Sequence, residues 1–285
     1  MTRAATRVVT TKAALRAART EAEGTAVVVM TMGALHDGHL ALVRRAREIA
    51  GEGGTVIVTI FVNPLQFGPG EDYEAYPRTL EADLALVDGV ADLVFAPEVE
   101  EMYPVLPPQV TVDVGALSTL FEGAARPTHF AGVATVVMKL LQLTRPDVAV
   151  FGRKDAQQFA LVSRLVADLD VPVLIEGVAI QREESGLARS SRNAYLSDDG
   201  RRTALALSRT IRAVEAAAPS VGAVLDALGS EADAEGVDWD YASAVDPVTF
   251  REIGTDHRGE VLVVLAARVE GTRLLDSTVI EATEA

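Results

Sequence analysis

The chain has 285 residues, of which 49% are hydrophobic, and its 41 acidic and 26 basic residues give a net charge of −15. That charge repels the phosphate backbone of nucleic acids and argues against nucleic-acid binding, although a local basic site can still hold a small phosphorylated ligand. Because the chain has no cysteine, disulfides, thiolate zinc sites and thiol nucleophiles are excluded.

The beginning of the chain lacks the apolar core of a signal peptide, and the later part of its first 21 residues has the pattern of an amphipathic helix. The longest apolar runs, such as 261–267, are too short to span a bilayer. We therefore expect a cytoplasmic protein without a membrane segment.

Short β-branched runs alternate with helical patterns through the first 180 residues. We predict strands at 26–32, 55–62, 91–97, 147–152 and 171–180. Helices are predicted between them at 38–50, 79–88, 130–143 and 155–168. Alternating strands and helices with right-handed crossovers predict an α/β domain, a Rossmann-like doubly wound parallel sheet.

The pattern changes after about residue 180. Helices are predicted at 198–217 and 220–233, and strands at 238–246, 260–269 and 272–280. This order predicts a smaller C-terminal α+β domain with an antiparallel sheet. We expect one domain over 1–180 that holds a ligand and a smaller lid domain over 181–285, joined by a charged connector.

Polar segments follow three of the predicted strands. They are TMGALHDGH after the first strand, FVNPLQFG after the second and FGRKDAQQ after the fourth. In open α/β sheets the ligand crevice lies beyond the carboxyl ends of the strands, so these segments are expected to converge there.

His36 and His39 bracket Asp37 and Gly38 at the start of a predicted helix. A zinc site would need at least one further ligand, which nothing in the sequence singles out. A structural turn is the second interpretation. The favoured one is anion binding, because Gly38 allows close backbone approach and the helix start offers N–H groups and two imidazole donors.

Lys154 and Gln158 flank a second helix start. Asp155 could be a helix N-cap with Gln158 three residues later, which would leave Lys154 as a surface charge. Alternatively, Lys154 pairs with phosphate oxygens and Gln158 binds a substrate hydroxyl, as Gln66 could from the facing side. Two such amides would make a polar pocket selective.

The loop 186–197 carries Ser190, Ser191 and Arg192. A simple turn before the next helix explains it. The alternative is a functional loop, because it lies at the expected domain junction, where a second domain could close over a bound nucleotide.

These segments, together with YPRT, RPTHFAGV, SSRN and TRLLD, occur in the order seen in the pantoate–β-alanine ligase family. The chain resembles that family over nearly its whole length. The segment from His36 to His39 also resembles the HxGH signature of the wider nucleotidyltransferase superfamily.

The resemblance implies an ATP- and Mg²⁺-dependent ligase that joins pantoate to β-alanine through a pantoyl adenylate, releasing AMP and pyrophosphate, and that is commonly a homodimer. It implies that His36, His39, Lys154, Ser190, Ser191 and Arg192 contact the ATP phosphates. Gln66 and Gln158 would hold pantoate. Met32 would line the pocket, Gly152 and Asp155 would lie at the ribose, and Asn63 and Tyr76 would form part of the wall. The resemblance implies no protein ligand for a metal. Arg126 and His129 are interpreted as structural or gate-related.

Three positions depart from the family pattern: Met30, Gln181 and Arg189. They motivate an alternative, a specialised paralogue that adenylates another carboxylate or uses another amine. A third hypothesis, a non-catalytic nucleotide-binding relative, predicts losses among His36, His39 and Lys154, and all three are present.

Overall fold

The computed structural model describes residues 5–230 and 235–284, which separate into two compact units. The first unit comprises the described residues of Met1–Gly152 and Leu161–Val178, and the second those of Arg153–Ala160 and Ala179–Ala285. The segment Arg153–Ala160 thus groups with the second unit, whereas the sequence suggested a single break after residue 180. Within the second unit, the Arg153 carbonyl accepts a hydrogen bond from Ser277 (3.1 Å).

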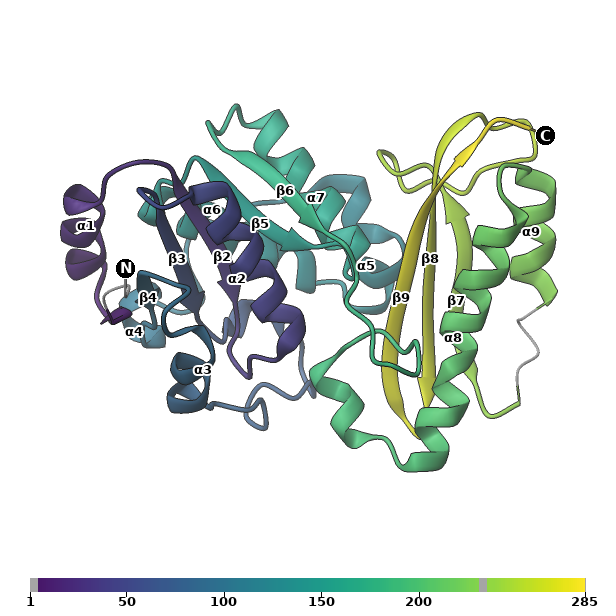
Figure 1. Cartoon of the computed structure of the whole chain (residues 1–285), viewed down its shortest axis with the longest axis horizontal. Coiled ribbons are helices and arrows are strands. Elements are labelled where there is room, and N and C mark those ends of the chain that lie inside the picture. Colours follow the sequence, from purple (N-terminus) through teal and green to yellow (C-terminus); the bar gives the residue numbers. More distant parts are fainter. Residues whose placement is uncertain (1–4, 231–234, 285) are drawn as a thin grey trace. The chain divides into compact units, whose positions relative to one another are not determined.

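The first unit is built on six parallel strands in the order β1-β4-β3-β2-β5-β6 (Figure 1). The strands are β1 (Arg7–Val9), β2 (Ala26–Thr31), β3 (Thr55–Ile60), β4 (Leu93–Phe95), β5 (Val148–Gly152) and β6 (Leu174–Val178). The predicted doubly wound parallel sheet is confirmed. The sequence missed β1 because this edge strand has three residues and exposes two of them.

Helices connect the parallel strands. They are α1 (Lys12–Glu21), α2 (Asp37–Ala50), α3 (Leu80–Val87), α4 (Val99–Met102), α5 (Phe121–Ala125), α6 (His129–Thr144) and α7 (Ala156–Asp168), with single 3-10 turns η1 (Pro64–Gln66) and η2 (Gly115–Thr119). The apolar stripe of α2 packs Val43 and Ala46 against Val27 and Val29 of β2. Helix α6 is buried around most of its circumference, as its sequence predicts.

The strand order fixes where a ligand crevice can form. From β2 the chain proceeds to β3 and β4 on one side, then returns to place β5 and β6 on the other. The direction of winding therefore reverses between β2 and β5, and their carboxyl ends lie side by side in the parallel sheet. Such a switch point is where doubly wound sheets bind ligands.

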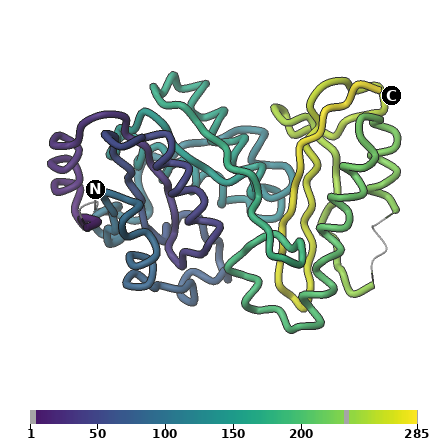
Figure 2. Tube along the Cα trace, in the orientation of Figure 1, coloured from purple at the N-terminus to yellow at the C-terminus, as the bar shows by residue number. Residues whose placement is uncertain are grey.

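The second unit contains an antiparallel sheet in the order β7-β8-β9, formed by β7 (Asp238–Val245), β8 (Gly259–Val269) and β9 (Thr272–Ala282). Helices α8 (Asp198–Ala217) and α9 (Val221–Ser230) pack against it (Figure 1), and the 3-10 turn η3 (Ser191–Tyr195) precedes α8. The trace in Figure 2 shows β8 and β9 as long neighbouring strands. The predicted α+β character is confirmed. Residues 231–233 of the helix predicted at 220–233 lie outside the described residues.

Helix α8 has the bounds that the sequence predicts. Ser197 caps it by accepting a hydrogen bond from the Gly200 N–H (3.0 Å), and Asp198 and Asp199 stand in its first turn. Within the described ranges, no helix is both long and apolar enough to cross a membrane.

Candidate active site

His36 and His39 cap helix α2 reciprocally. The backbone N–H of Gly38 donates to Nδ1 of His36 (3.0 Å), and the backbone N–H of His36 donates to Nδ1 of His39 (3.3 Å). Ser or Thr with Glu or Gln normally forms such a capping box. The structural turn that the sequence suggested is therefore real, and one N–H group of the helix start, that of Gly38, is engaged within it.

The same cap determines the tautomer of both rings. A neutral imidazole that accepts a hydrogen bond at Nδ1 carries its proton at Nε2, where it is a donor. The His36 and His39 rings lie 4.2 Å apart between centroids, tilted by 48°, and both are half-buried. The cap thus holds two donor groups together just beyond the carboxyl end of β2.

Asp83 holds the loop that leads from β2 to this cap. Its carboxylate accepts hydrogen bonds from the backbone N–H of Ala34 (3.1 Å) and of Leu35 (2.8 Å), and only 2% of Asp83 is exposed. Gly33 has a φ of 86°, and a Cβ there would approach Asp83 to 3.0 Å. The glycine therefore provides both the left-handed conformation and the space that this contact requires.

The amide of Gln66 is oriented by Asn63. Asn63 Nδ2 donates to Oε1 of Gln66 (3.0 Å) and to the Gly132 carbonyl (3.1 Å), while Asn63 Oδ1 accepts from the Tyr103 hydroxyl (3.1 Å). Because Oε1 accepts from Asn63, the Nε2 group of Gln66 is the part of this amide that can donate to a ligand. Asn63 itself is fully buried, so it supports Gln66 from behind. Burial also raises the pKa of the Tyr103 hydroxyl, which stays a donor.

The backbone of Gln66 is held by the segment before and within the first turn of α6. Arg126 Nη2 donates to the Gln66 carbonyl (3.0 Å), and Nδ1 of His129 lies 3.0 Å from the same oxygen. A Cβ at Gly132 would overlap the Leu65 carbonyl, so this glycine permits close packing of α6 on η1. Arg126 and His129 therefore have a structural role, one of the two interpretations offered for them.

Arg126 also forms an ion pair with Glu71, in which Nε of Arg126 lies 2.9 Å from Oε1 of Glu71. The hydrogen bond from Arg126 lowers the pKa of Glu71 below its ordinary value, against the opposing effect of burial. In the same loop, Tyr76 packs its ring against Phe67 (5.9 Å between centroids). The ion pair thus links this loop to Arg126, which also holds the backbone of Gln66.

Three further predicted residues lie near strand ends or helix starts. Met32 follows β2 directly, Gly152 is the last residue of β5, and both are half-buried. Asp155 is exposed and immediately precedes α7, so it occupies the position of an N-cap residue.

In the second unit, Lys154 lies half-buried in the turn between β5 and α7. The guanidinium of Arg153 stacks over the Phe159 ring at 5.3 Å, so the turn folds back onto the first turn of α7. Gln158 lies in that same helical turn and is half-buried.

The predicted phosphate loop, residues 190–192, forms the start of the 3-10 turn η3. Ser190 Oγ accepts a hydrogen bond from the Arg192 N–H (3.3 Å), and Ser191 is exposed. Asn193, of which 3% is exposed, anchors this turn by donating to the Ala188 carbonyl (3.1 Å) and to Glu183 (2.8 Å). Asn193 thus holds the backbone that carries the hydroxyls of Ser190 and Ser191 and the guanidinium of Arg192.

The predicted site residues therefore divide between the two units. Met32, His36, His39, Asn63, Gln66, Tyr76 and Gly152 belong to the first, and Lys154, Asp155, Gln158, Ser190, Ser191 and Arg192 to the second. That both sets meet around one ligand stays a prediction. Among residues 5–230 and 235–284, no group of three or more His, Asp or Glu side chains is arranged to hold a metal ion.

Comparison with known proteins decides the family. The sequence profile of pantoate-beta-alanine ligase matches residues 4–279. The chain belongs to the pantoate–β-alanine ligase family. The pantothenate synthetase of Leifsonia xyli subsp. xyli is 54% identical over 253 residues, covering 88% of this chain and 87% of that protein. That of Acidothermus cellulolyticus is 53% identical over 272 residues, covering 92% and 88%.

Solved structures agree with this membership of the pantoate–β-alanine ligase family. The pantothenate synthetase of Thermus thermophilus superposes with a TM-score of 0.86 at 44% identity, covering 95% of this chain and 98% of that one. The pantoate–β-alanine ligase of Francisella tularensis, complexed with a β-γ ATP compound and β-alanine, gives 0.76 at 29% identity, covering 96% and 97%.

Sequence reasoning missed the residues that support the predicted site. Asp83, Tyr103 and Asn193 contact predicted site residues or their loops, yet none was singled out for a function. Asp83 did leave a signal, because it lies four residues before Val87 on the same face of the helix, where an apolar side chain is expected. Asn193 had one as well, as a polar residue next to the predicted phosphate loop.

Proposed function

We propose that the chain catalyses the ATP-dependent condensation of pantoate and β-alanine to pantothenate, with AMP and pyrophosphate as the other products. The observation that carries this proposal is the reciprocal histidine cap, which orients two donors at the carboxyl end of β2. Membership of the family supports it, as does the Francisella tularensis relative, whose structure contains an ATP compound and β-alanine.

In the first step a carboxylate oxygen of pantoate attacks the α-phosphorus of ATP. The bond from that phosphorus to the oxygen bridging to the β-phosphate breaks, and pyrophosphate leaves with the bonding electrons. This step needs in-line positioning and donors aimed at the developing charge, and it needs no covalent nucleophile from the protein. The cysteine-free chain supplies suitable donors in His36, His39, Lys154 and Arg192, with Ser190 and Ser191 beside them.

Pantoate is recognised by the two glutamines. Gln66 presents Nε2 to the ligand because Asn63 engages its Oε1 atom. Gln158 binds the hydroxyl or carboxylate group from α7, Met32 lines the pocket, and Tyr76 forms part of its wall. Gly152 and Asp155 lie at the ribose of the nucleotide.

In the second step the amine of β-alanine attacks the acyl carbon of pantoyl adenylate. The bond from that carbon to the AMP oxygen breaks, AMP leaves, and the nitrogen loses a proton as the amide forms. The donors that hold the α-phosphate also stabilise AMP as the leaving group.

Mg²⁺ fits this site as part of the nucleotide complex. Magnesium keeps several waters and binds substrate phosphates in preference to cages made only of protein ligands. The described residues contain no such cage, and Lys154 and Arg192 would hold the phosphates that carry the ion. When bound, Mg²⁺ neutralises charge on those oxygens.

The three departures from the family pattern do not favour the alternative substrates. The Gln181 amide donates to the Ala179 carbonyl (3.1 Å), and Arg189 Nε donates to the Arg182 carbonyl (3.3 Å). Met30 is a half-buried residue of β2 that pairs with Thr59. The side chains of Gln181 and Arg189 thus donate hydrogen bonds to backbone carbonyls of their own loop.

We also propose that the protein is a cytoplasmic homodimer that binds no nucleic acid. The family resemblance supports the dimer, and the net charge of −15 disfavours nucleic acid. Light scattering after gel filtration measures the assembly, and a monomer mass would refute the dimer.

The first step is tested by isotope exchange between pyrophosphate and ATP. Exchange that requires pantoate and does not require β-alanine is expected, because the adenylate forms reversibly before the amine enters. Exchange with other hydroxy acids and none with pantoate would favour the specialised paralogue.

A further inference from the structure

Two consecutive residues of β9, Asp276 and Ser277, contact two separate loops of the second unit. Ser277 Oγ donates to the Arg153 carbonyl (3.1 Å), directly before Lys154. Asp276 accepts hydrogen bonds from Nη1 and Nη2 of Arg182, at 2.7 and 3.0 Å. Both strand residues are buried, with 2% and 6% of their surface exposed.

The contact with Arg182 continues to the predicted phosphate loop. Arg182 pairs with Ala188 across a short antiparallel bridge, and its Nη1 also donates to the Gly186 carbonyl (3.1 Å). Asn193 Nδ2 donates to the Ala188 carbonyl, and the Asn193 N–H donates to the carbonyl of Ser190 (3.1 Å). An unbroken series of contacts thus runs from Asp276 to the turn that carries Ser190, Ser191 and Arg192.

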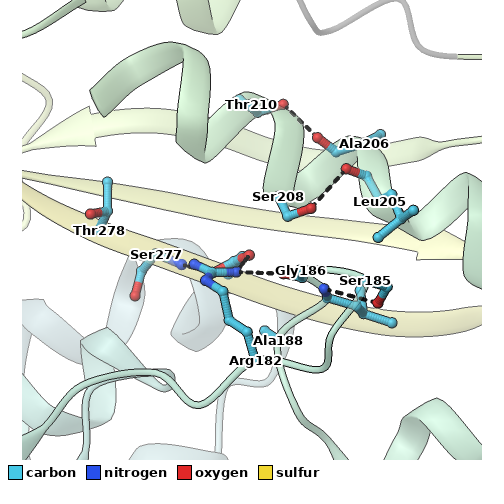
Figure 3. A network of polar contacts seen from close by, with 12 residues as sticks. Arg182, Ser185, Gly186, Ala188, Leu205, Ala206, Ser208, Thr210, Ser277 and Thr278 are labelled. Carbon is cyan, nitrogen blue, oxygen red and sulfur yellow. Dashed lines mark hydrogen bonds and ion pairs between the residues drawn. The ribbon is translucent and has the colours of Figure 1, made fainter. Parts of the chain in front are cut away.

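The Arg182–Asp276 pair fixes the loop of Arg182 relative to β9. Two parallel hydrogen bonds fix both the distance and the plane of the guanidinium, which one point contact would not do. Burial opposes the charged form of Arg182, yet its pairing with Asp276 raises the pKa of Arg182 above the ordinary value. Figure 3 shows Arg182 reaching from its loop toward β9.

We propose that Asp276 and Ser277 are positioning residues that hold the turn of Lys154 and the turn of Ser190–Arg192 at a fixed separation for binding ATP phosphates. This inference rests on the proposed function, because it takes Lys154 and Arg192 as phosphate ligands. Neighbouring residues of a strand form a short and stiff connection. Loss of either contact would therefore let one of the two turns shift and would change the distance between Lys154 and Arg192.

The next residue of the strand provides a matched control. Thr278 Oγ1 donates to Glu215 of α8 (2.8 Å), and Figure 3 shows Ser277 and Thr278 on opposite sides of β9. Thr278→Val and Ser277→Ala each remove one hydroxyl hydrogen bond from β9, but only the second loosens the Lys154 turn. Asp240, which pairs with Arg273 between β7 and β9, is the matched control for charge.

The experiment measures the dissociation constant of MgATP by calorimetry, and the KM values for ATP and β-alanine, in full-length variants. Ser277→Ala is expected to weaken MgATP binding about three- to tenfold, as expected for one lost hydrogen bond. Asp276→Asn and the milder Arg182→Lys are expected to weaken it about tenfold or more. The KM for β-alanine should stay within about twofold, and Thr278→Val and Asp240→Asn should bind MgATP like the parent.

Unchanged MgATP affinity in both Ser277→Ala and Arg182→Lys would overturn the inference, as would equal losses in the two controls. If Asp276→Asn does not fold, the MgATP affinity of Arg182→Lys tests the contribution of the ion pair. The affinity readout does not depend on the carboxylic acid. A parent protein that binds MgATP and does not use pantoate would refute the proposed function, and the variants would still decide the positioning role.

Discussion

The imidazoles of His36 and His39 lie 4.2 Å apart, and each accepts a backbone N–H at Nδ1. One pair of residues therefore serves as helix cap and as donor pair. A Ser–Glu capping box would satisfy the same backbone groups without offering N–H donors to an anion. The structural and the phosphate interpretations of this motif are thus compatible.

Replacement of His36 by asparagine separates its two roles. Asparagine is a good N-cap, so His36→Asn should keep nearly the parent stability, whereas His36→Ala should lose about 1 kcal/mol of unfolding free energy. Both variants lose the Nε2 donor and should lower kcat about 100- to 1000-fold. Urea unfolding and steady-state rates measure the two effects, and a fully active His36→Asn would remove His36 from the chemistry.

The Tyr103–Asn63–Gln66 series predicts a graded loss of pantoate affinity. Gln66→Ala removes the ligand donor and should raise the KM for pantoate at least about tenfold. Tyr103→Phe leaves Asn63 Oδ1 with one partner fewer, and should raise that KM by a few fold. The KM for ATP is the internal control. An equal rise in both KM values for Tyr103→Phe would show general destabilisation.

Gln158→Ala tests the second glutamine. We expect mainly weaker use of pantoate, because the substrate group that it binds would be left without its partner. Initial rates over a range of pantoate concentrations measure the effect. Unchanged dependence on pantoate would contradict the assignment of Gln158.

Gly132→Ala tests the close approach of α6 to η1. The new methyl group would overlap the Leu65 carbonyl, so we expect destabilisation of about 1–3 kcal/mol and a raised KM for pantoate. Gly229→Ala is the matched control, because Gly229 is also helical and has open space around it. That change should be neutral or stabilise by up to about 1 kcal/mol. Equal behaviour of the two variants would refute the packing argument.

The Glu71–Arg126 pair predicts a dependence of stability on acidic pH. The pKa of Glu71 in the folded protein lies below its ordinary value of 4.5, mainly because Arg126 donates to it. The stability that this pair contributes is therefore present above about pH 4.5 and is lost as the pH falls through the folded-state pKa.

Glu71→Gln should accordingly be less stable than the parent at pH 7, with a difference that shrinks below pH 4.5. Urea unfolding at pH 7, 5, 4 and 3 measures it, and Glu74→Gln in the same loop controls for net charge. A difference that stays constant with pH would contradict the proposed contribution of Glu71.

Long elements could be predicted from the sequence because their periodicity is strong. Helix α8 matches its predicted bounds, and β2 and β3 were found as continuous apolar runs. The three-residue β1 and four-residue α4 were missed, because so few residues show no periodicity. The predicted strand 171–180 proved shorter, at Leu174–Val178, and at its start Pro172 cannot donate to the sheet.

The sequence indicates a candidate site where a motif marks it, and gives less information where tertiary contacts support it. His36 and His39 stand out as paired histidines at a helix start. Nothing local shows that Tyr103 reaches Asn63 across 40 residues, or that Asp276 reaches Arg182 across 94. Such contacts depend on the packing of distant elements, which one sequence does not display.

The central claim is tested most directly by AMP release from ATP with Mg²⁺, pantoate and β-alanine, each omitted in turn. We predict sustained AMP and pyrophosphate production, in equal amounts with pantothenate, only when every component is present. A folded protein that binds ATP and forms no AMP with pantoate and β-alanine, while another acid or amine supports turnover, would contradict the account.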